Sequence, residues 1–244
     1  ALSFFRMFYN KFTAYRARLE RLYGFLLSTE EKHTARQLDL TEVSDGLILE
    51  NVALYRHNGE VLLDGININL KSGNSLLIRG PSGCGKTSLL RALAGLWPFG
   101  SSGKVSHPPH QEILFLPQRP YTAQGSLRDA ICYPDIDKQH PELIDAMNTC
   151  RLGYLVDKLD KPDDWQHKLS PGELQRVAFV RALLSQPKVI LLDEATAALD
   201  EPTEAMLYRA LKQKLPDSII ISIGHRSTLN EFHDLCLDVG HVQC

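Results

Sequence analysis

The sequence predicts an α/β domain with a mostly parallel sheet, an antiparallel β subdomain before it and a helical subdomain inserted into it. Three observations predict this fold class. A glycine-rich loop stands between a strand and a helix at Gly80–Thr87. Short apolar strands alternate with helical patterns after residue 75, as in parallel sheets covered by helices on both faces. Strand signals then vanish between Ser126 and Leu169, which leaves room for a helical insertion.

Residues 1–37 differ from the 38–244 domain that follows, and they predict an amphipathic helical extension from a membrane domain. Tyr15, Leu19 and Leu22 recur at helical spacing between charged residues. Basic residues outnumber acidic ones here, which suits the cytoplasmic side of a membrane. A helix that simply packs on the domain behind it explains the pattern equally well. Residues 30–46 are polar and are interpreted as a linker.

The antiparallel subdomain is predicted from two strands, Leu47–Leu54 and Ile66–Leu70, that flank the turn residues His57-Asn58-Gly59. The stretch Phe99–Pro109 is rich in Gly, Ser and Pro and is expected to be a loop. A short buried strand is expected at Ile113–Leu116, before Pro117-Gln118.

The helical subdomain is expected over about 125–185. One helix is expected to open at Ser126-Leu127-Arg128-Asp129, and Ser170 is expected to cap a longer helix over Gly172–Ser185. Three further strands are expected at Val189–Leu192, Ser218–Ile223 and Leu235–Val239, with a helix at Pro202–Leu215 between the first two.

The phosphate loop, Gly80–Thr87, has the spacing Gly, four residues, Gly-Lys-Thr that binds nucleoside triphosphates. Glycines let successive N–H groups point at phosphate oxygens, and the helix that follows adds its positive end. Lys86 supplies a charge for the β- and γ-phosphates, and the Thr87 hydroxyl is a hard ligand suited to Mg²⁺. The expected phosphate-binding residues are Gly80, Pro81, Ser82, Gly83, Cys84, Gly85, Lys86, Thr87 and Ser88.

Two adjacent carboxylates, Asp193 and Glu194, follow a buried strand and complete the predicted nucleotide site. Ligands of open α/β sheets lie at the carboxyl ends of the strands. Asp193 would hold Mg²⁺ through water, and Glu194 would polarise an attacking water as general base. An acidic pair that merely caps a helix is the simpler alternative, but the phosphate loop upstream favours the site.

Composition narrows the class of protein. The formal net charge of −2 gives no basic field, so nucleic acid is not expected as a partner. The five cysteines are odd in number and form no Cys-x-x-Cys pair, which argues against disulfide or zinc frameworks. Cys84 is interpreted as a tolerated loop residue.

Four further motifs occur in a fixed order, and together with the phosphate loop and the acidic pair they resemble the nucleotide-binding domain of ABC transporters. The segment Leu169–Glu173 looks like the signature motif, usually Leu-Ser-Gly-Gly-Gln. Gln118 looks like the Q-loop, Ala198-Leu199-Asp200 like the D-loop and His225 like the switch histidine. Any one of them alone would be read as a surface or strand-end residue.

The resemblance implies an ATPase with ATP and Mg²⁺ as cofactors, working as a pair of domains. ATP would lie between the phosphate loop of one domain and Ser170 and Gly172 of the other. Gln118 would contact Mg²⁺ or the attacking water, and His225 would bond to the γ-phosphate. This chain departs from the usual signature at Pro171, which has no N–H, and at Glu173, which adds a negative charge.

An aromatic side chain stacks on adenine in many members of this family. Tyr55 stands close to the usual place, although Arg56 or His57 could occupy it, and Tyr133 is a second candidate. Packing tyrosines at a strand end and a turn are equally good interpretations.

A narrower resemblance is carried by residues 93–98, 115–121 and 125–129. These segments are similar to the D subfamily and to bacterial half-transporters of the YddA and SbmA/BacA type. The resemblance implies a partner ATPase domain, a membrane-spanning domain outside this chain, and a place on the cytoplasmic face of a membrane. A soluble ABC ATPase without a transport role and an ATP-binding regulatory module are the alternatives.

Overall fold

The central element of the computed structural model is a five-stranded parallel sheet in the order β11-β4-β10-β9-β6. The structure describes residues 9, 11–13, 15, 16, 18–24 and 38–240. Strands β9 and β10 are buried along their whole length, as continuous apolar runs in a covered parallel sheet must be. The strands are β4 (Ser75–Arg79), β6 (Ile113–Leu116), β9 (Val189–Asp193), β10 (Ile219–Ile223) and β11 (Leu235–Asp238).

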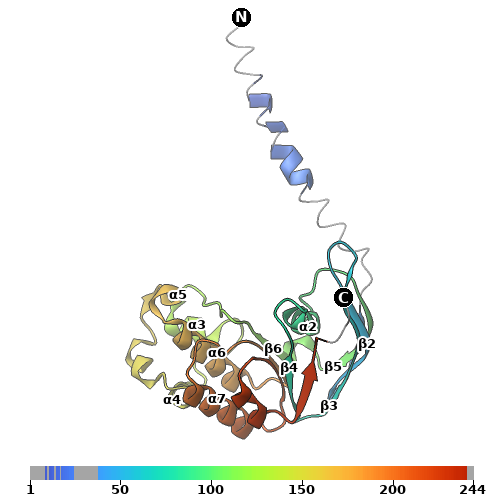
Figure 1. The fold of residues 1–244 in the computed structure, drawn as a ribbon. Helices are drawn as coiled ribbons and strands as arrows, with labels where there is room; N and C mark the ends of the chain where they lie inside the picture. Colours follow the sequence, from blue (N-terminus) through green and yellow to red (C-terminus); the bar gives the residue numbers. More distant parts are fainter. Residues whose placement is uncertain (1–8, 10, 14, 17, 25–37, 241–244) are drawn as a thin grey trace, which may run out of the picture.

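The two faces of this sheet pack into two different hydrophobic cores. Successive side chains of a strand point to opposite faces, so Leu191 packs with α2 (Lys86–Leu93) and Leu192 with α6 (Pro171–Ser185) and α7 (Glu201–Lys214). Each fully buried Leu or Ile in these cores stabilises the fold by roughly 1.5–3 kcal/mol. Figure 1 shows α2 between the parallel sheet and the β subdomain, with α6 and α7 on the opposite side.

A second sheet has the order β1-β5-β2-β3 and forms the β subdomain. The predicted antiparallel pair is confirmed by β2 (Leu47–Tyr55) and β3 (Val61–Leu70). Two predictions are wrong here: β1 (Asp39–Glu42) lies in the expected linker, and β5 (Ser101–His107) lies in the expected loop.

The strand β5 forms because both of its edges are paired, parallel to β1 and antiparallel to β2. Its glycine marks a bulge rather than a loop. Gly103 has φ of 99°, and a Cβ there would lie 2.4 Å from the carbonyl oxygen of Asn51, where the β2 register shifts. Pairing with distant strands therefore overrides the local Gly/Ser signal.

The helical subdomain follows β6 and carries α3 (Leu127–Cys132), α4 (Leu143–Thr149), the 3₁₀ helix η3 (Gly153–Lys158) and α5 (Trp165–Lys168) before α6. The predicted cap at Ser170 is confirmed as a capping box with Glu173, and the helix predicted to open at Ser126 begins with a second capping box, Ser126 with Asp129. A two-residue ladder between β7 (Gly125–Ser126) and β8 (Pro162–Asp163) interrupts what was expected to be wholly helical. The remaining 3₁₀ helices are η2 (His110–Glu112) and η4 (Ser227–Phe232).

The expected N-terminal extension, residues 1–37, falls largely outside the described residues. Those that are described between Tyr9 and Gly24 are helical and exposed, including the apolar Tyr15, Leu19 and Leu22. Within the part of the chain that the structure describes, no helix is long and apolar enough to cross a membrane.

Candidate functional site

The predicted site residues meet at one edge of the parallel sheet. The phosphate loop follows β4, and Gln118 follows β6. Asp193 ends β9 with Glu194 next to it, and His225 follows β10. Because these strands are parallel, their carboxyl ends share one edge, where ligands of such sheets bind.

The phosphate loop turns on three glycines in conformations that other residues rarely adopt. Gly80, Gly83 and Gly85 have φ of 143°, 81° and 101°. A Cβ at Gly80 would lie 2.3 Å from the carbonyl oxygen of Val239, so this position also needs glycine for space. The Lys86 ammonium donates to the carbonyl oxygens of Gly80 and Pro81 at 2.8 and 2.7 Å. The loop thus closes around its own lysine.

Thr87 and Asp193 come together although 106 residues separate them in sequence. The Thr87 hydroxyl donates to the Asp193 Oδ1 atom at 2.9 Å. Burial raises the pKa of Asp193, and the nearby Glu194 adds to that rise, while the bond from Thr87 opposes it. A hydroxyl and a carboxylate beside the phosphate loop form a fitting donor set for Mg²⁺, because this ion prefers hard oxygen ligands.

Glu194 is the centre of the remaining cluster. Its Oε2 atom accepts a hydrogen bond from Gln118 Nε2 at 3.0 Å, and its Oε1 atom lies 3.2 Å from His225 Nε2. Its φ of 50° places it in the left-handed region, which is strained for a residue with a side chain. The structure thus brings together three of the four residues predicted to be catalytic; the fourth, Lys86, lies in the phosphate loop. A carboxylate held between an amide and an imidazole can orient and deprotonate a water.

The signature segment lies at the start of α6. The Ser170 hydroxyl donates to Glu173 Oε2 at 2.5 Å, and Tyr154 also donates to Glu173. Burial favours a higher pKa for Glu173, but the bonds from Ser170 and Tyr154 outweigh it and lower that pKa. A Cβ at Gly172 would lie 3.2 Å from the carbonyl oxygen of Ala198. These contacts join the segment to its own helix and to the stretch after β9, not to the phosphate loop.

The two candidate adenine contacts, Tyr55 and Tyr133, lie apart. The Tyr55 hydroxyl bonds to Ser102 Oγ at 3.2 Å, and its ring covers Gly100. The ring of Tyr133 meets that of Tyr121 edge-on, with 5.8 Å between centroids. A base contact for either residue stays a prediction.

Two buried polar residues near the site were not predicted. Gln175 on α6 donates to the backbone carbonyl oxygen of Gln118, and Glu204 on α7 accepts from Thr196. Helical spacing alone shows that each faces inward, but not which backbone or side chain it meets. A polar residue on the apolar face of a helix was the available signal.

Comparisons with known proteins give the family. A family model described as ABC transporter matches residues 63–197, more than half of the 244 residues. The chain belongs to the ABC transporter family. It is this family's ATP-binding domain and an ATPase. The resemblance inferred from the order of the sequence motifs is therefore confirmed.

Relatives of this ABC ATPase domain include bacterial and eukaryotic proteins. An uncharacterised ABC transporter ATP-binding protein of Haemophilus influenzae is 53% identical over 241 residues, which cover 98% of this chain and 41% of that protein. The chloroplastic ABC transporter D family member 2 of Arabidopsis thaliana is 40% identical over 233 residues, covering 75% and 33%. The chain therefore spans less than half the length of these relatives.

A solved structure shows the same fold. A bacterial Atm1-family ABC exporter with ATP bound aligns with a TM-score of 0.70 and 24% identity, covering 82% of this chain and 40% of that one. The ABC ATPase fold predicted from the motifs is thereby confirmed.

Proposed function

We propose that this domain drives transport across a membrane by hydrolysing Mg·ATP in a pair of such domains. The observation that carries the proposal is the convergence of Gln118 and His225 on Glu194, beside the Thr87–Asp193 pair. Relatives that are two to three times longer support a membrane-spanning part outside this chain and a place on the cytoplasmic face of a membrane.

In the proposed mechanism each group has one task. Lys86 leaves the carbonyl oxygens of Gly80 and Pro81 and turns its ammonium to the β- and γ-phosphates. Glu194 accepts the proton of the attacking water, and His225 donates a hydrogen bond to the γ-phosphate.

Gln118, Thr87 and Asp193 would hold Mg²⁺, Asp193 through water. When bound, Mg²⁺ neutralises charge on the β- and γ-phosphates. The raised pKa of Asp193 supports this assignment, because a nearby cation would favour the carboxylate form.

The second domain is proposed to supply Ser170 and Gly172. Both lie at the start of α6, where backbone N–H groups and the helix dipole favour an anion. Ser170 and Gly172 contact the helical subdomain and the D-loop of their own chain, not its phosphate loop. We therefore infer that the nucleotide they contact is bound to the phosphate loop of a second chain. A partner's ATP fits this role.

The test measures the ATPase rate per chain as chain concentration rises, for the parent and for Glu194→Gln. The parent rate should rise with concentration to a plateau and should vanish when EDTA removes Mg²⁺. Glu194→Gln should bind ATP like the parent and turn it over at a small fraction of the parent rate.

Three results would contradict the proposal. An ATPase rate per chain that does not depend on chain concentration would contradict a hydrolytic site formed by two domains. Full turnover by Glu194→Gln would remove Glu194 as the base. ATP binding without turnover at any concentration would favour a regulatory module.

A further inference from the structure

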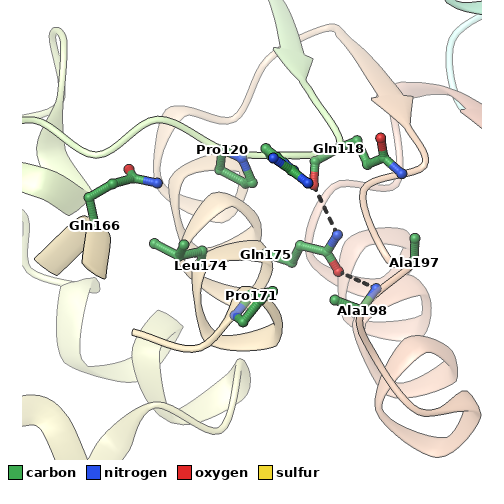
Figure 2. A pocket seen from close by; sticks show the side chains of 9 residues that line it. Gln118, Pro120, Gln166, Pro171, Leu174, Gln175, Ala197 and Ala198 are labelled. Atoms are coloured by element: carbon green, nitrogen blue, oxygen red, sulfur yellow. Dashed lines mark hydrogen bonds between the residues drawn. The ribbon is translucent and has the colours of Figure 1, made fainter. Parts of the chain in front are cut away.

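Gln175 is a buried amide that connects three parts of the site. Its side chain is 2% exposed and projects from α6 toward the end of β6. Its Nε2 atom donates to the backbone carbonyl oxygen of Gln118 at 3.1 Å, and its Oε1 atom accepts from the backbone N–H of Ala198 at 3.0 Å. Figure 2 shows the amide spanning from one segment to the other.

These two bonds close a circuit through Glu194. The side chain of Gln118 donates to Glu194 at 3.0 Å, and the backbone N–H of Ala197 donates to the Glu194 carbonyl oxygen at 3.0 Å. Gln175 thus bonds to Gln118, which contacts the Glu194 side chain, and to Ala198, whose chain neighbour Ala197 contacts the Glu194 backbone. A displacement of α6 would reach the Glu194 carboxylate through Gln118 and the Glu194 backbone through the D-loop.

A cavity of about 370 Å³ lies beside the Gln175 amide, so the segments that the amide connects are not held together there by packed side chains. It opens between α6, the segment after Gln118 and the D-loop. The cavity is lined by Gln118, Arg119, Pro120, Gln166, Pro171, Leu174, Gln175, Ala197 and Ala198 (Figure 2). Where side chains leave a gap, hydrogen bonds across it fix the relative position of the two sides.

We propose that Gln175 is a positioning residue for hydrolysis. It holds Gln118 and the D-loop at a fixed position relative to α6, and so sets the position of the Glu194 carboxylate. This inference rests on the proposed roles of Gln118 and Glu194. It assigns to α6 a mechanical link to the hydrolytic groups within one chain, besides the contact that its N-terminus would make with a partner's nucleotide.

The main test compares Gln175→Met with the parent chain at the plateau of the concentration series. Removing the support of a site residue typically lowers activity 10- to 100-fold. We expect kcat to fall roughly within that range, about 10- to 100-fold, while the dissociation constant for ATP stays within about twofold. The phosphate loop does not touch Gln175, so binding is spared.

A second variant separates the two arms. Gln175→Glu keeps an acceptor for the Ala198 N–H but places a carboxylate oxygen against the Gln118 carbonyl oxygen. We expect kcat to fall as far as in Gln175→Met, because two acceptors repel each other.

The control is Ser218→Ala, which also removes a buried side-chain hydrogen bond. The Ser218 hydroxyl donates to the carbonyl oxygen of Pro187 at 2.6 Å, before β9 and β10 begin and thus at the opposite ends of these strands from Glu194. It should lower the melting temperature, by less than Gln175→Met because one bond is lost rather than two, and leave kcat unchanged. Equal losses of kcat in the two variants would reduce Gln175 to a structural role.

A double-mutant cycle with Gln118→Ala decides whether Gln175 acts through Gln118. Coupled residues give effects that do not add, so the double variant should be little slower than Gln118→Ala alone. Additive losses, or parent-like kcat in Gln175→Met, would overturn the inference. If Gln118→Ala itself hydrolyses at the parent rate, the proposed role of Gln118 fails and the inference fails with it. If only Gln118→Ala is slow, the inference alone fails.

Discussion

The buried carboxylate of Glu204 gives the sharpest prediction about what holds the site together. Its side chain is 2% exposed, and Oε1 accepts from Thr196 Oγ1 at 2.5 Å. Its Oε2 atom accepts from Thr228 Oγ1 at 3.3 Å and lies 3.5 Å from Arg226 Nη1. Thr196 follows Glu194, and Arg226 follows His225. Glu204 therefore fastens the two hydrolytic segments to α7.

Replacing Glu204 by Ala should lower the free energy of unfolding by about 3 kcal/mol. The short bond from Thr196 contributes roughly 1.5–3 kcal/mol, as hydrogen bonds to charged groups do. The contacts with Thr228 and Arg226 are longer and add less. Arg226 is one third exposed (34%), so without Glu204 its charge still reaches water, which keeps the loss at the lower end of the range for broken buried pairs.

The assay is thermal unfolding, followed by ATP hydrolysis well below the transition. For a chain of this size about 3 kcal/mol corresponds to a fall in melting temperature of roughly 6–12 °C. Glu204→Gln still offers one acceptor and one donor to the two threonines, so its loss should be only about 1 kcal/mol. Glu204→Ala should also lower kcat, since the His225 segment loses its anchor. A melting temperature and kcat equal to those of the parent would refute the reasoning.

Two further substitutions test the phosphate loop and the start of α6. Lys86→Ala should raise the dissociation constant for ATP roughly 10- to 150-fold, the equivalent of one charge-assisted bond of about 1.5–3 kcal/mol, measured by equilibrium binding; a normal constant would contradict its phosphate role. Gly172→Ala should change stability by less than about 1 kcal/mol, because better helix propensity offsets crowding against Ala198. Its kcat should fall as the D-loop shifts, and an unchanged kcat would count against that coupling.

The sequence predicted that the candidate site residues would meet at one edge of the sheet, because they lie at strand ends. Asp193 ends an apolar strand, Gln118 and His225 stand two residues after one, and parallel pairing brings such positions to one edge. The contacts of Glu194 with two partners confirm that these strand ends converge. Their distances could not be predicted, since strand order and side-chain rotamers depend on packing between distant segments.

The errors in the fold have the same physical source. Strand β5 was expected to be a loop because local Gly and Ser residues disfavour strands, but its hydrogen bonds come from β1 and β2, whose paired residues lie about 47 to 65 positions earlier. Gln175 and Glu204 were missed because a helical pattern identifies the buried face of a helix without identifying its partners.

The first turn of α6 shows how the departures from the usual signature affect anion binding. Pro171 has no N–H, and the N–H of Glu173 is taken by Ser170 Oγ at 3.3 Å. Among the described residues, this leaves Gly172 with the one first-turn N–H that has no partner. The Ser170 hydroxyl is also held by the Glu173 carboxylate, which competes with a phosphate for its proton and adds a negative charge nearby.

Changing both residues to the usual ones, Pro171→Gly with Glu173→Gln, should therefore strengthen ATP capture and weaken the fold. One added N–H donor is worth roughly 0.5–1.5 kcal/mol, so the KM for ATP should fall roughly two- to twelvefold. Stability should fall by about 1 kcal/mol, since glycine gives the unfolded chain more freedom and glutamine loses the interaction with the helix dipole.

The control for the backbone effect is Pro202→Gly at the start of α7, where a proline also occupies the first turn. It should lower stability similarly and leave the KM unchanged. If the double variant keeps the parent's KM while both variants lose stability, the start of α6 does not meet the nucleotide. The paired site would then need another source for its second half. A lower KM in the α6 variant alone would mean that the phosphates of ATP reach the first turn of α6. Within one chain this turn contacts Glu173 and Ala198 and not the phosphate loop, so the ATP would be that of a partner domain.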